Sequence, residues 1–457
     1  MAEWDMRYYS TRNKNEEAGF ARAALAGLAP DGGLYVPGEI PAFTASVAAS
    51  LGSMDYRDVA FETIRPYVAG DVPDSALADM VADAYPFDAP LVPVGDRLAL
   101  ELFHGPTAAF KDFGARFMAR AFAWLRRGED RPLRIIAATS GDTGGAVADG
   151  FFGVPGVFVT VLYPKGRVSP LQERQIAGLG GNVSALAVEG SFDDCQRLAK
   201  EALAARQAGG REDLSSANSI NIARLVPQAA YYASAAGKAA AGTHDPDGPA
   251  TPRAAVMEEK RAKPATGPAT VCVPSGNLGN LTAGLYAMRM GAPILRFVAA
   301  SNSNRTFHDY LESGGYRPRD SVATVSNAMD VGAPSNFERI SAHFSLDVLR
   351  LLVRGDWISD YDTRETIKRA KERLGYFMDP HTAVGWKALD RLAAEGRAVG
   401  GPVVALAAAH PAKFAETVGP LAGPPPVPET LARAMERTPA AKTIPAELPA
   451  LLAELGE

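Results

Sequence analysis

Short apolar runs alternate with helical patterns through most of the chain after residue 98. Examples of these runs are "PLRIIAAT", "GVFVTVLYP", "TVCV" and "VVALAAA", and each is followed by a helical pattern. Strands that are apolar along their whole length are typical of parallel sheets that helices cover on both faces. The pattern therefore predicts an α/β fold with two parallel-sheet lobes.

The first part of the chain, residues 1–97, has a different pattern. A helix in "GFARAALAG" is expected to end at Gly27, with Pro30 just beyond it. Helical patterns continue in "MDYRDVAFETIRPYVAG" and "DSALADMVADAY". These features predict a small, mostly helical N-terminal domain.

The rest of the chain divides into four predicted parts. Residues 98–130 carry the first segment of a large domain, and residues 131–204 form a small α/β lobe. The large α/β domain resumes at 205–425, and residues 426–457 form a helical extension after the Pro-rich "GPPPVP". Within the large domain, residues 237–268 are rich in Pro, Gly and mixed charges, which predicts a disordered-type insertion.

The segment "SPLQERQIAGLGG" carries the signature of a helix start. Ser169 can cap the helix, Pro170 suits its first position, and Gln172 completes a capping box. We expect a helix to begin here.

Composition excludes several classes of function. The chain has 457 residues, 47% of them hydrophobic and 22% charged, with a net charge of -5. Such a balance provides no basic surface for nucleic acid or membranes. Two distant cysteines, Cys195 and Cys272, and six scattered histidines indicate neither a disulfide framework nor a metal site. Without an apolar signal peptide or membrane span, we expect a cytoplasmic protein.

Two glycine-rich loops follow strands of the predicted sheets. They are "TSGDTGG", residues 139–145, and "PSGNLGN", residues 274–280. In the second loop, Gly276 and Gly279 let backbone N–H groups turn inward at a helix start, which suits a phosphate. Neither loop has the spacing of a P-loop or of a dinucleotide-binding loop, so a monophosphate is favoured over ATP. The alternative is an ordinary strand-to-helix turn.

Lys111 stands between two phenylalanines in "FHGPTAAFKDFGARF", where a Gly-Pro turn becomes a helix. A lysine in such company is commonly a surface residue whose stem covers apolar neighbours. Near a phosphate-binding loop, however, an amine with a pKa lowered by burial suits a Schiff base to a phosphorylated aldehyde. The residues alone thus favour a site with a lysine and a phosphate.

Many motifs, in order along nearly the whole chain, resemble those of the threonine synthase family. They are "MRYYSTRN", "GLAPDGGLYVP", "ELFHGPTAAFKDFGARF", "ATSGDTGGA", "YPKGRVSPLQERQ", "NSINIARLVPQ", "PSGNLGNLTAG", "VSNAMDVGAPSNFER", "DPHTAVG" and "AHPAKF". The chain is similar to the long microbial and fungal form of this family. The resemblance implies a fold-type II pyridoxal-phosphate enzyme that converts O-phospho-L-homoserine and water to L-threonine and phosphate.

The resemblance also implies roles for individual residues. Lys111 holds pyridoxal 5'-phosphate as a Schiff base and then shuttles protons at the α and β carbons of the substrate. The cradle for the cofactor phosphate consists of Ser275, Gly276, Asn277, Leu278 and Gly279. The loop that receives the substrate carboxylate consists of Ser140, Gly141, Asp142 and Thr143, with Asp142 also beside the ring hydroxyl of the cofactor.

Three further groups of residues have two interpretations. Lys165, Arg167 and Ser169 are expected to bind the leaving phosphate, unless they form a solvated basic loop. Asn327, Asp330, Asn336 and Arg339 are expected to complete the substrate pocket, although Arg339 could equally pair with a structural carboxylate. Asp379, His381 and Thr382 either cap the next helix or touch the substrate.

One position departs from the family pattern. The family usually has a threonine three residues before the proline of "HPAKF", where its hydroxyl meets the pyridine nitrogen, and this chain has Ala408 there. An aliphatic group cannot form that hydrogen bond, so the sequence does not show which group interacts with the pyridine nitrogen and tunes the electronic properties of the cofactor. A phospholyase or dehydratase that releases an α-keto acid and ammonia is therefore the nearest alternative.

Two more distant alternatives are less favoured. A nucleotide-dependent oxidoreductase lacks its GxGxxG loop here, and a non-enzymatic binding protein would not need Lys111 with both loops. We expect a monomer or weak homodimer that acts on a small molecule, with neither nucleic acid nor membrane as partner. Residues 131–204 are expected to move as a lobe that closes over the substrate and excludes water.

Overall fold

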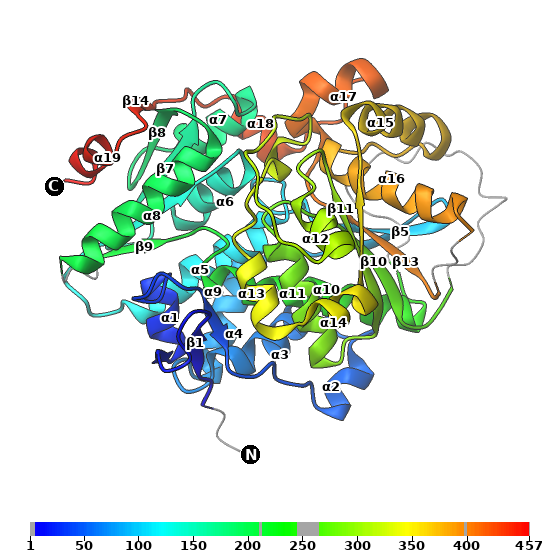
Figure 1. The fold of residues 1–457 in the computed structure, drawn as a ribbon, viewed down its shortest axis with the longest axis horizontal. Helices are drawn as coiled ribbons and strands as arrows, with labels where there is room; N and C mark the ends of the chain where they lie inside the picture. Colours follow the sequence, from blue (N-terminus) through cyan, green and yellow to red (C-terminus); the bar gives the residue numbers. More distant parts are fainter. Residues whose placement is uncertain (1–4, 210–212, 245–264, 397–399, 457) are drawn as a thin grey trace.

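The computed structural model describes residues 5–209, 213–244, 265–396 and 400–456. In Figure 1, strands β7 and β8 of one sheet lie to the left, and β10 and β13 of a second sheet lie to the right. Helices surround both sheets. The predicted α/β fold with two parallel-sheet lobes is confirmed.

The N-terminal region combines four helices with a small antiparallel sheet. The helices are α1 (Phe20–Ala26), α2 (Ala45–Ser50), α3 (Tyr56–Val68) and α4 (Asp74–Ala84), and the strands are β1 (Tyr8–Ser10), β2 (Glu17–Ala18) and β3 (Tyr35–Pro37). Helix α1 ends at Gly27, as predicted, because the glycine adopts a φ of 74° and its amide returns to the Ala23 carbonyl. The buried side chains of this region share one core with those of the large domain, so it has no separate core.

The larger sheet has six strands in the order β12-β11-β10-β13-β5-β4. These are β12 (Val353–Trp357), β11 (Ile294–Ser301), β10 (Ala269–Pro274), β13 (Val403–Ala407), β5 (Arg97–Glu101) and β4 (Leu91–Val94). Neighbouring strands are parallel except β4, which runs antiparallel to β5. Residues 91–97 of the predicted N-terminal domain thus already belong to this sheet.

The smaller sheet has five parallel strands in the order β14-β8-β7-β6-β9. These are β14 (Lys442–Pro445), β8 (Val183–Glu189), β7 (Val157–Pro164), β6 (Leu133–Ala138) and β9 (Leu214–Ser216). Strand β9 lies beyond residue 204, and β14 comes from the C-terminal segment, which was predicted as a helical extension. A four-residue strand whose only buried side chain is Ile444 carries too little periodicity to be recognised.

The remaining helices cover the sheets and join them. They are α5 (Lys111–Leu125), α6 (Asp142–Phe151), α7 (Pro170–Ala177), α8 (Phe192–Ala208), α9 (Ile222–Leu225), α10 (Ala229–Ala241), α11 (Gly279–Met290), α12 (Thr306–Ser313), α13 (Phe337–His343), α14 (Leu346–Leu352), α15 (Asp360–Leu374), α16 (Pro380–Ala394), α17 (Ala415–Ala422), α18 (Glu429–Met435) and α19 (Leu448–Glu454). Helix α16 packs on β10, β11 and β13, and α8 packs on β6 and β7. Helix α5 packs on α6 of the smaller lobe and on α4 and α9.

The predicted capping box is present at the start of α7. The amide of Gln172 donates to Ser169 Oγ at 3.2 Å, and the amide of Ser169 donates to Gln172 Oε1 at 2.9 Å. The predicted insertion at 237–268 begins too early, because residues 237–241 continue α10. Its central part, residues 245–264, lies outside the described residues.

Three features concern the membrane, metal and disulfide interpretations of the sequence. None of the described helices is both long enough and apolar enough to cross a membrane. Within the described residues, no cluster of His, Cys, Asp and Glu side chains is suited to hold a metal ion. Cys195 and Cys272 are both buried and free.

Candidate active site

Lys111 is fixed beside the end of β13 by backbone hydrogen bonds. The amide of Phe110 donates to the carbonyl of Ala408 at 2.9 Å, and the amide of His410 donates to the carbonyl of Ala108 at 2.9 Å. The residues just before α5 therefore pair with those just after a central strand. In a parallel sheet, ligands bind at this carboxyl edge.

The turn before α5 is held by Asp112. Its carboxylate accepts hydrogen bonds from the amide of Thr107, at 2.9 Å, and from the Thr107 hydroxyl. A Cβ atom at Gly105 would lie 2.4 Å from Asp112 Oδ2, so the close approach of this carboxylate requires glycine. The Gly-Pro turn thus sets the point at which α5 begins with Lys111.

Lys111 is partly exposed, and it lines a cavity between the two sheets. Its Nζ atom lies 4.7 Å from the centroid of the Phe110 ring. Burial lowers the pKa of Lys111 to about 8, against the opposing effect of the nearby Asp142 carboxylate. A free amine at this position is therefore accessible close to neutral pH.

A second part of the cavity wall is the loop between β10 and α11. Ser275, Gly276, Asn277, Leu278 and Gly279 all line the cavity. In the part of the chain that the structure describes, the amides of residues 276–279 donate to no protein acceptor. A Cβ atom at Gly276 would lie 2.8 Å from the Cα of Met329, so only glycine fits there. Free amides at the start of a helix form an anion-binding site.

Side chains behind this loop hold it in place. Asn277 donates through Nδ2 to Ser219 Oγ at 2.9 Å. Asn336 donates to the Asn277 carbonyl and to Ser219 Oγ, both at 3.1 Å. Arg339 in turn donates to Asn336 Oδ1 at 2.6 Å. This layer fixes the direction of the loop amides.

The loop from Thr139 to Asp142 faces the cavity from the smaller lobe. Thr139 Oγ1 accepts hydrogen bonds from the amides of Gly141, at 2.9 Å, and Gly144, at 2.8 Å. Gly141 has a φ of 145°, a conformation that favours glycine. Ser140, Asp142 and Thr143 line the cavity.

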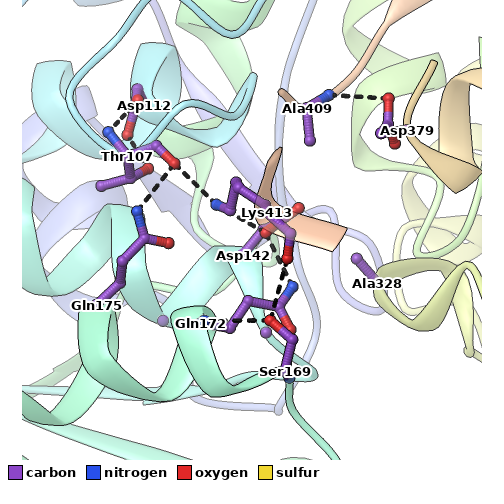
Figure 2. A network of polar contacts seen from close by, with 12 residues as sticks. Thr107, Asp112, Asp142, Ser169, Gln172, Gln175, Ala328, Asp379, Ala409 and Lys413 are labelled. Atoms are coloured by element: carbon purple, nitrogen blue, oxygen red, sulfur yellow. Dashed lines mark hydrogen bonds and ion pairs between the residues drawn. The ribbon is translucent and has the colours of Figure 1, made fainter. Parts of the chain in front are cut away.

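Asp142 carries a buried charge. Its Oδ1 lies 2.8 Å from Lys413 Nζ and accepts a hydrogen bond from Gln172 Nε2 at 3.0 Å (Figure 2). Burial alone would raise the pKa of Asp142, but the ammonium groups of Lys413 and Lys111 outweigh it and hold that pKa well below its usual range. Asp142 is therefore an anion at any physiological pH.

The segment "DPHTA" contributes His381 to the cavity wall. Asp379 caps α16 by accepting from the amide of His381, and it lies 2.7 Å from His381 Nδ1. His381 Nε2 accepts the amide of Ala328 at 3.2 Å, so Nδ1 carries the proton toward Asp379. Asp379 thus caps the helix, as one interpretation predicted, and His381 lines the cavity; contact with the substrate stays a prediction.

Five polar residues of the cavity lining were not among those predicted: Asn218, Ser219, Arg224, Gln228 and Asn280. Arg224 is 2% exposed, and no described carboxylate pairs with it. Its NH1 group donates to the Ala217 carbonyl at 2.7 Å, while its Nε has no hydrogen-bond partner among the described residues. Burial lowers the pKa of Arg224 to about 10, so it remains a cation. The sequence did contain one signal for two of these residues: Arg224 and Gln228 are four residues apart, a spacing that places them on one face of a helix.

The predicted basic loop lies outside the cavity lining. Lys165 is exposed and lies 3.4 Å from Glu189. Arg167 is also exposed, and Ser169 caps α7 and donates to the Lys413 carbonyl at 3.3 Å. In this structure these side chains do not meet Lys111.

The predicted residues of "SNAMDVGAPSNFER" lie behind the cavity. Asn327 donates to Gln172 Oε1 at 3.1 Å, and Asp330 accepts the Thr324 amide at 2.9 Å. Arg339 is fully buried and donates to the carbonyls of Tyr35 and Ile220, at 2.9 and 2.7 Å, rather than to a carboxylate. None of the four predicted residues in this segment lines the cavity, and Asn336 and Arg339 donate to lining residues, Ser219 and Asn277.

The cavity suits a phosphorylated aldehyde and a second anion. Lys111 supplies the amine, and the loop at residues 276–279 supplies free amides at a helix start. The charged groups that act on Lys111 are Asp142, Arg224, Lys413 and Asp379, so the cations outnumber the carboxylates when Lys111 is protonated. Pyridoxal phosphate has the aldehyde and the phosphate that this donor set fits.

Models of three protein families match the chain. One, described as the threonine synthase N terminus, matches residues 7–85, and one for pyridoxal-phosphate dependent enzymes matches residues 97–408. A third, described as the threonine synthase C-terminal region, matches residues 382–453. Together they cover most of the chain.

Individual proteins agree with these matches. The chain is 39% identical to the threonine synthase of Serratia marcescens over 444 residues, or 96% of this chain and 97% of the relative. The crystal structure of threonine synthase from Escherichia coli superposes with a TM-score of 0.87 at 37% identity, covering 98% of this chain and 99% of that one. A structure of pyridoxal-phosphate-bound threonine synthase from Brucella melitensis has a TM-score of 0.82 at 36% identity, with 98% of both chains covered.

Proposed function

Because the chain belongs to the threonine synthase family, we propose that it converts O-phospho-L-homoserine and water into L-threonine and phosphate. The observation that carries this proposal is the position of Lys111. It shares one cavity with the glycine-rich loops that follow β6 and β10. The enzyme is a pyridoxal-phosphate-dependent lyase.

The cofactor would be held at two points. The amides of residues 276–279, at the start of α11, would bind its phosphate, with Ser275 at the edge of the loop. Lys111 would bind its aldehyde carbon covalently. When bound, pyridoxal phosphate supplies an electron sink that stabilises negative charge at the α carbon of an amino acid.

We propose that Lys111 moves the protons of the reaction. A freed amine whose pKa lies at about 8 exchanges protons readily near neutral pH. We assign to it the removal of the proton from the α carbon of the substrate and the later transfers at the β carbon. Partial burial keeps competing water away from this amine.

The two charged ends of the substrate need separate sites. The loop from Ser140 to Thr143, at the start of α6, would receive the carboxylate through its backbone amides. Arg224 is a buried cation without a carboxylate partner among the described residues, which supports it as the ligand of the leaving phosphate. Asn218 and Ser219 would donate further hydrogen bonds there.

The remaining predicted residues fall into two groups. Lys165, Arg167 and Ser169 would contribute to the leaving phosphate only if the lobe at residues 131–204 closes over the cavity. We propose that Asn327, Asp330, Asn336 and Arg339 act on substrate indirectly, by holding the loops that line the site. Hydrogen exchange of β6, β7 and β8 with and without a phosphonate substrate analogue tests closure; equal exchange in both states contradicts it.

The activity is tested by incubating purified protein, loaded with pyridoxal phosphate, with O-phospho-L-homoserine. Equimolar threonine and phosphate, without ammonia, are the expected products. Release of 2-oxobutyrate and ammonia would instead identify a lyase of the phospholyase or dehydratase type. Lys111→Ala is the control, and it should lose both the products and the borohydride-reducible absorbance band of the bound cofactor.

We further propose that the protein works in the cytoplasm as a monomer or weak homodimer, without nucleic acid or membrane. The small net charge of -5 supports the absence of a nucleic-acid partner. Sedimentation velocity at several protein concentrations tests the assembly state, and a stable tetramer would contradict it.

A further inference from the structure

Lys413 lies where three segments of the chain meet. It belongs to the short helix η4 (Pro411–Phe414), which follows β13 of the larger sheet, and its side chain is fully buried. Its Nζ lies 2.8 Å from Asp142 Oδ1 and donates to the Thr107 carbonyl at 2.8 Å. Figure 2 shows Lys413 between these two residues. One ammonium group therefore joins the two lobes and the turn that leads to Lys111.

The partners of Lys413 are themselves fixed. Gln172 donates through Nε2 to Asp142 Oδ1 at 3.0 Å, and the Ser169 hydroxyl donates to the Lys413 carbonyl at 3.3 Å (Figure 2). Asp142 Oδ2 receives no hydrogen bond from the residues that the structure describes. Oδ1 of Asp142 is thus held by Lys413 and Gln172, whereas Oδ2 is available to a ligand in the cavity that Asp142 lines.

The ion pair of Lys413 and Asp142 also affects the protonation of Lys111. The groups that act on the Lys111 ammonium are Asp142, Arg224, Lys413 and Asp379. Asp142 stabilises the ammonium form, whereas Lys413 and Arg224 destabilise it. A buried carboxylate without its cation would act on Lys111 at full strength, because little water is present to screen it.

We propose that Lys413 is a positioning residue for the cofactor lysine: it holds Asp142 in one orientation across the two lobes and cancels its charge. In this arrangement the charge of Asp142 acts on the ammonium of Lys111 only together with the opposing charge of Lys413. The proposal rests on the proposed function only in that Lys111 carries the cofactor. It adds a residue that does not itself line the cavity and acts through Asp142, which does.

The test compares four forms of the full-length, cofactor-loaded enzyme: wild type, Lys413→Met, Lys413→Arg and the double variant Lys413→Met with Asp142→Asn. The readout is the absorbance of the bound cofactor as a function of pH, which reports the protonation of the Lys111 nitrogen. In Lys413→Met the midpoint should rise by about one pH unit, because a carboxylate several ångströms away is left uncompensated.

The other two variants separate charge from packing. Lys413→Arg keeps the cation, and its midpoint should stay close to that of the wild type. The double variant removes both charges, so the midpoint should return to within about half a pH unit of the wild type. Two results overturn the proposal: an unchanged midpoint in folded Lys413→Met, or an equal shift in Lys413→Arg.

The test has an alternative measurement for each way in which Lys413→Met could fail. If Lys413→Met does not retain the cofactor, the pH dependence of Lys111 acylation in the cofactor-free full chain, read by peptide mass spectrometry, reports the pKa of the free Lys111 amine instead, which should rise by a similar amount relative to the cofactor-free wild type. If Lys413→Met does not fold, a shift of more than about one pH unit in the double variant overturns the proposal. Absence of threonine formation by the wild type would refute the proposed function and leave this titration unaffected.

Discussion

The backbone amide of Ala408 donates a hydrogen bond to the Thr382 hydroxyl oxygen at 3.0 Å. This contact joins the end of β13 to the first turn of α16. The Thr382 hydroxyl donates its own hydrogen to Asp379 Oδ2, so it has no second hydrogen to offer a ligand. Ala408 therefore presents only a methyl group to the cavity, and the Thr382 hydroxyl beside it already donates its hydrogen to Asp379.

Replacing Thr382 by valine should destabilise the protein. The change removes one acceptor and one donor from buried partners at nearly constant volume, which costs about 1–3 kcal/mol in the free energy of unfolding. Urea unfolding followed by circular dichroism measures this loss. Thr382→Ser keeps the hydroxyl and should lose less; equal losses in the two variants would show that the methyl group matters instead.

Replacing Gly276 by alanine should weaken cofactor binding. The new Cβ would lie 2.8 Å from the Met329 Cα, so the loop at residues 276–279 must move, and overpacking of this kind costs about 1–3 kcal/mol. We expect a 10- to 100-fold higher dissociation constant for pyridoxal phosphate, roughly the equivalent of that energy. Gly419→Ala is the matched control, since nothing lies within 4 Å of the added atom there.

Replacing Arg224 by methionine should weaken the interaction with phosphate. Losing a charge-assisted contact of about 2–3 kcal/mol predicts a roughly 100-fold fall in kcat/KM for O-phospho-L-homoserine. Inhibition by inorganic phosphate should weaken in parallel. Arg167→Met serves as the comparison, because Arg167 is exposed and outside the cavity lining. A larger effect at Arg167 would assign the leaving phosphate to the basic loop after β7.

Lys111 should make the stability of the cofactor-free protein depend on pH. Its pKa falls from 10.5 in the unfolded chain to about 8 in the folded one, so the unfolded state binds more protons between these values. Stability should rise as pH increases from about 8 to 10.5. Lys111→Met should therefore be more stable than the wild type at pH 7, by on the order of 1–3 kcal/mol.

The same comparison at higher pH is the check on this prediction. Above pH 10.5 both states of the wild type carry a neutral lysine, and the difference between the two proteins should disappear. Guanidinium unfolding at pH 7, 9 and 11 measures it. A difference that stays constant over this range would show that the stability change comes from packing rather than from charge.

Local patterns along the chain predicted the main elements of the fold. The capping box at Ser169 and the helix end at Gly27 were found because the residues that form them are adjacent in sequence. The two parallel sheets were predicted because the apolar residues of each strand are also adjacent in sequence. Strand β14 was not predicted, because only one of its residues, Ile444, is buried and the strand forms by pairing with β8, which is distant in sequence.

The site was predictable only in part. Lys111 and the loop at residues 275–279 follow strands and carry recognisable residue types, and they meet in one cavity. Arg224 was missed because a buried arginine looks like a surface arginine in a sequence. Lys413 was missed because its role depends on Asp142, which lies in the other lobe. Relationships of that kind exist only after the chain has folded.

Strand β14 has a consequence for synthesis of the chain. It completes the edge of the sheet beside β8, although β8 leaves the ribosome far earlier. Until residues 442–445 emerge, β8 exposes an edge that other nascent chains can pair with. A messenger RNA truncated before the codons for residues 442–445 would therefore yield an aggregation-prone product rather than a slightly shortened enzyme.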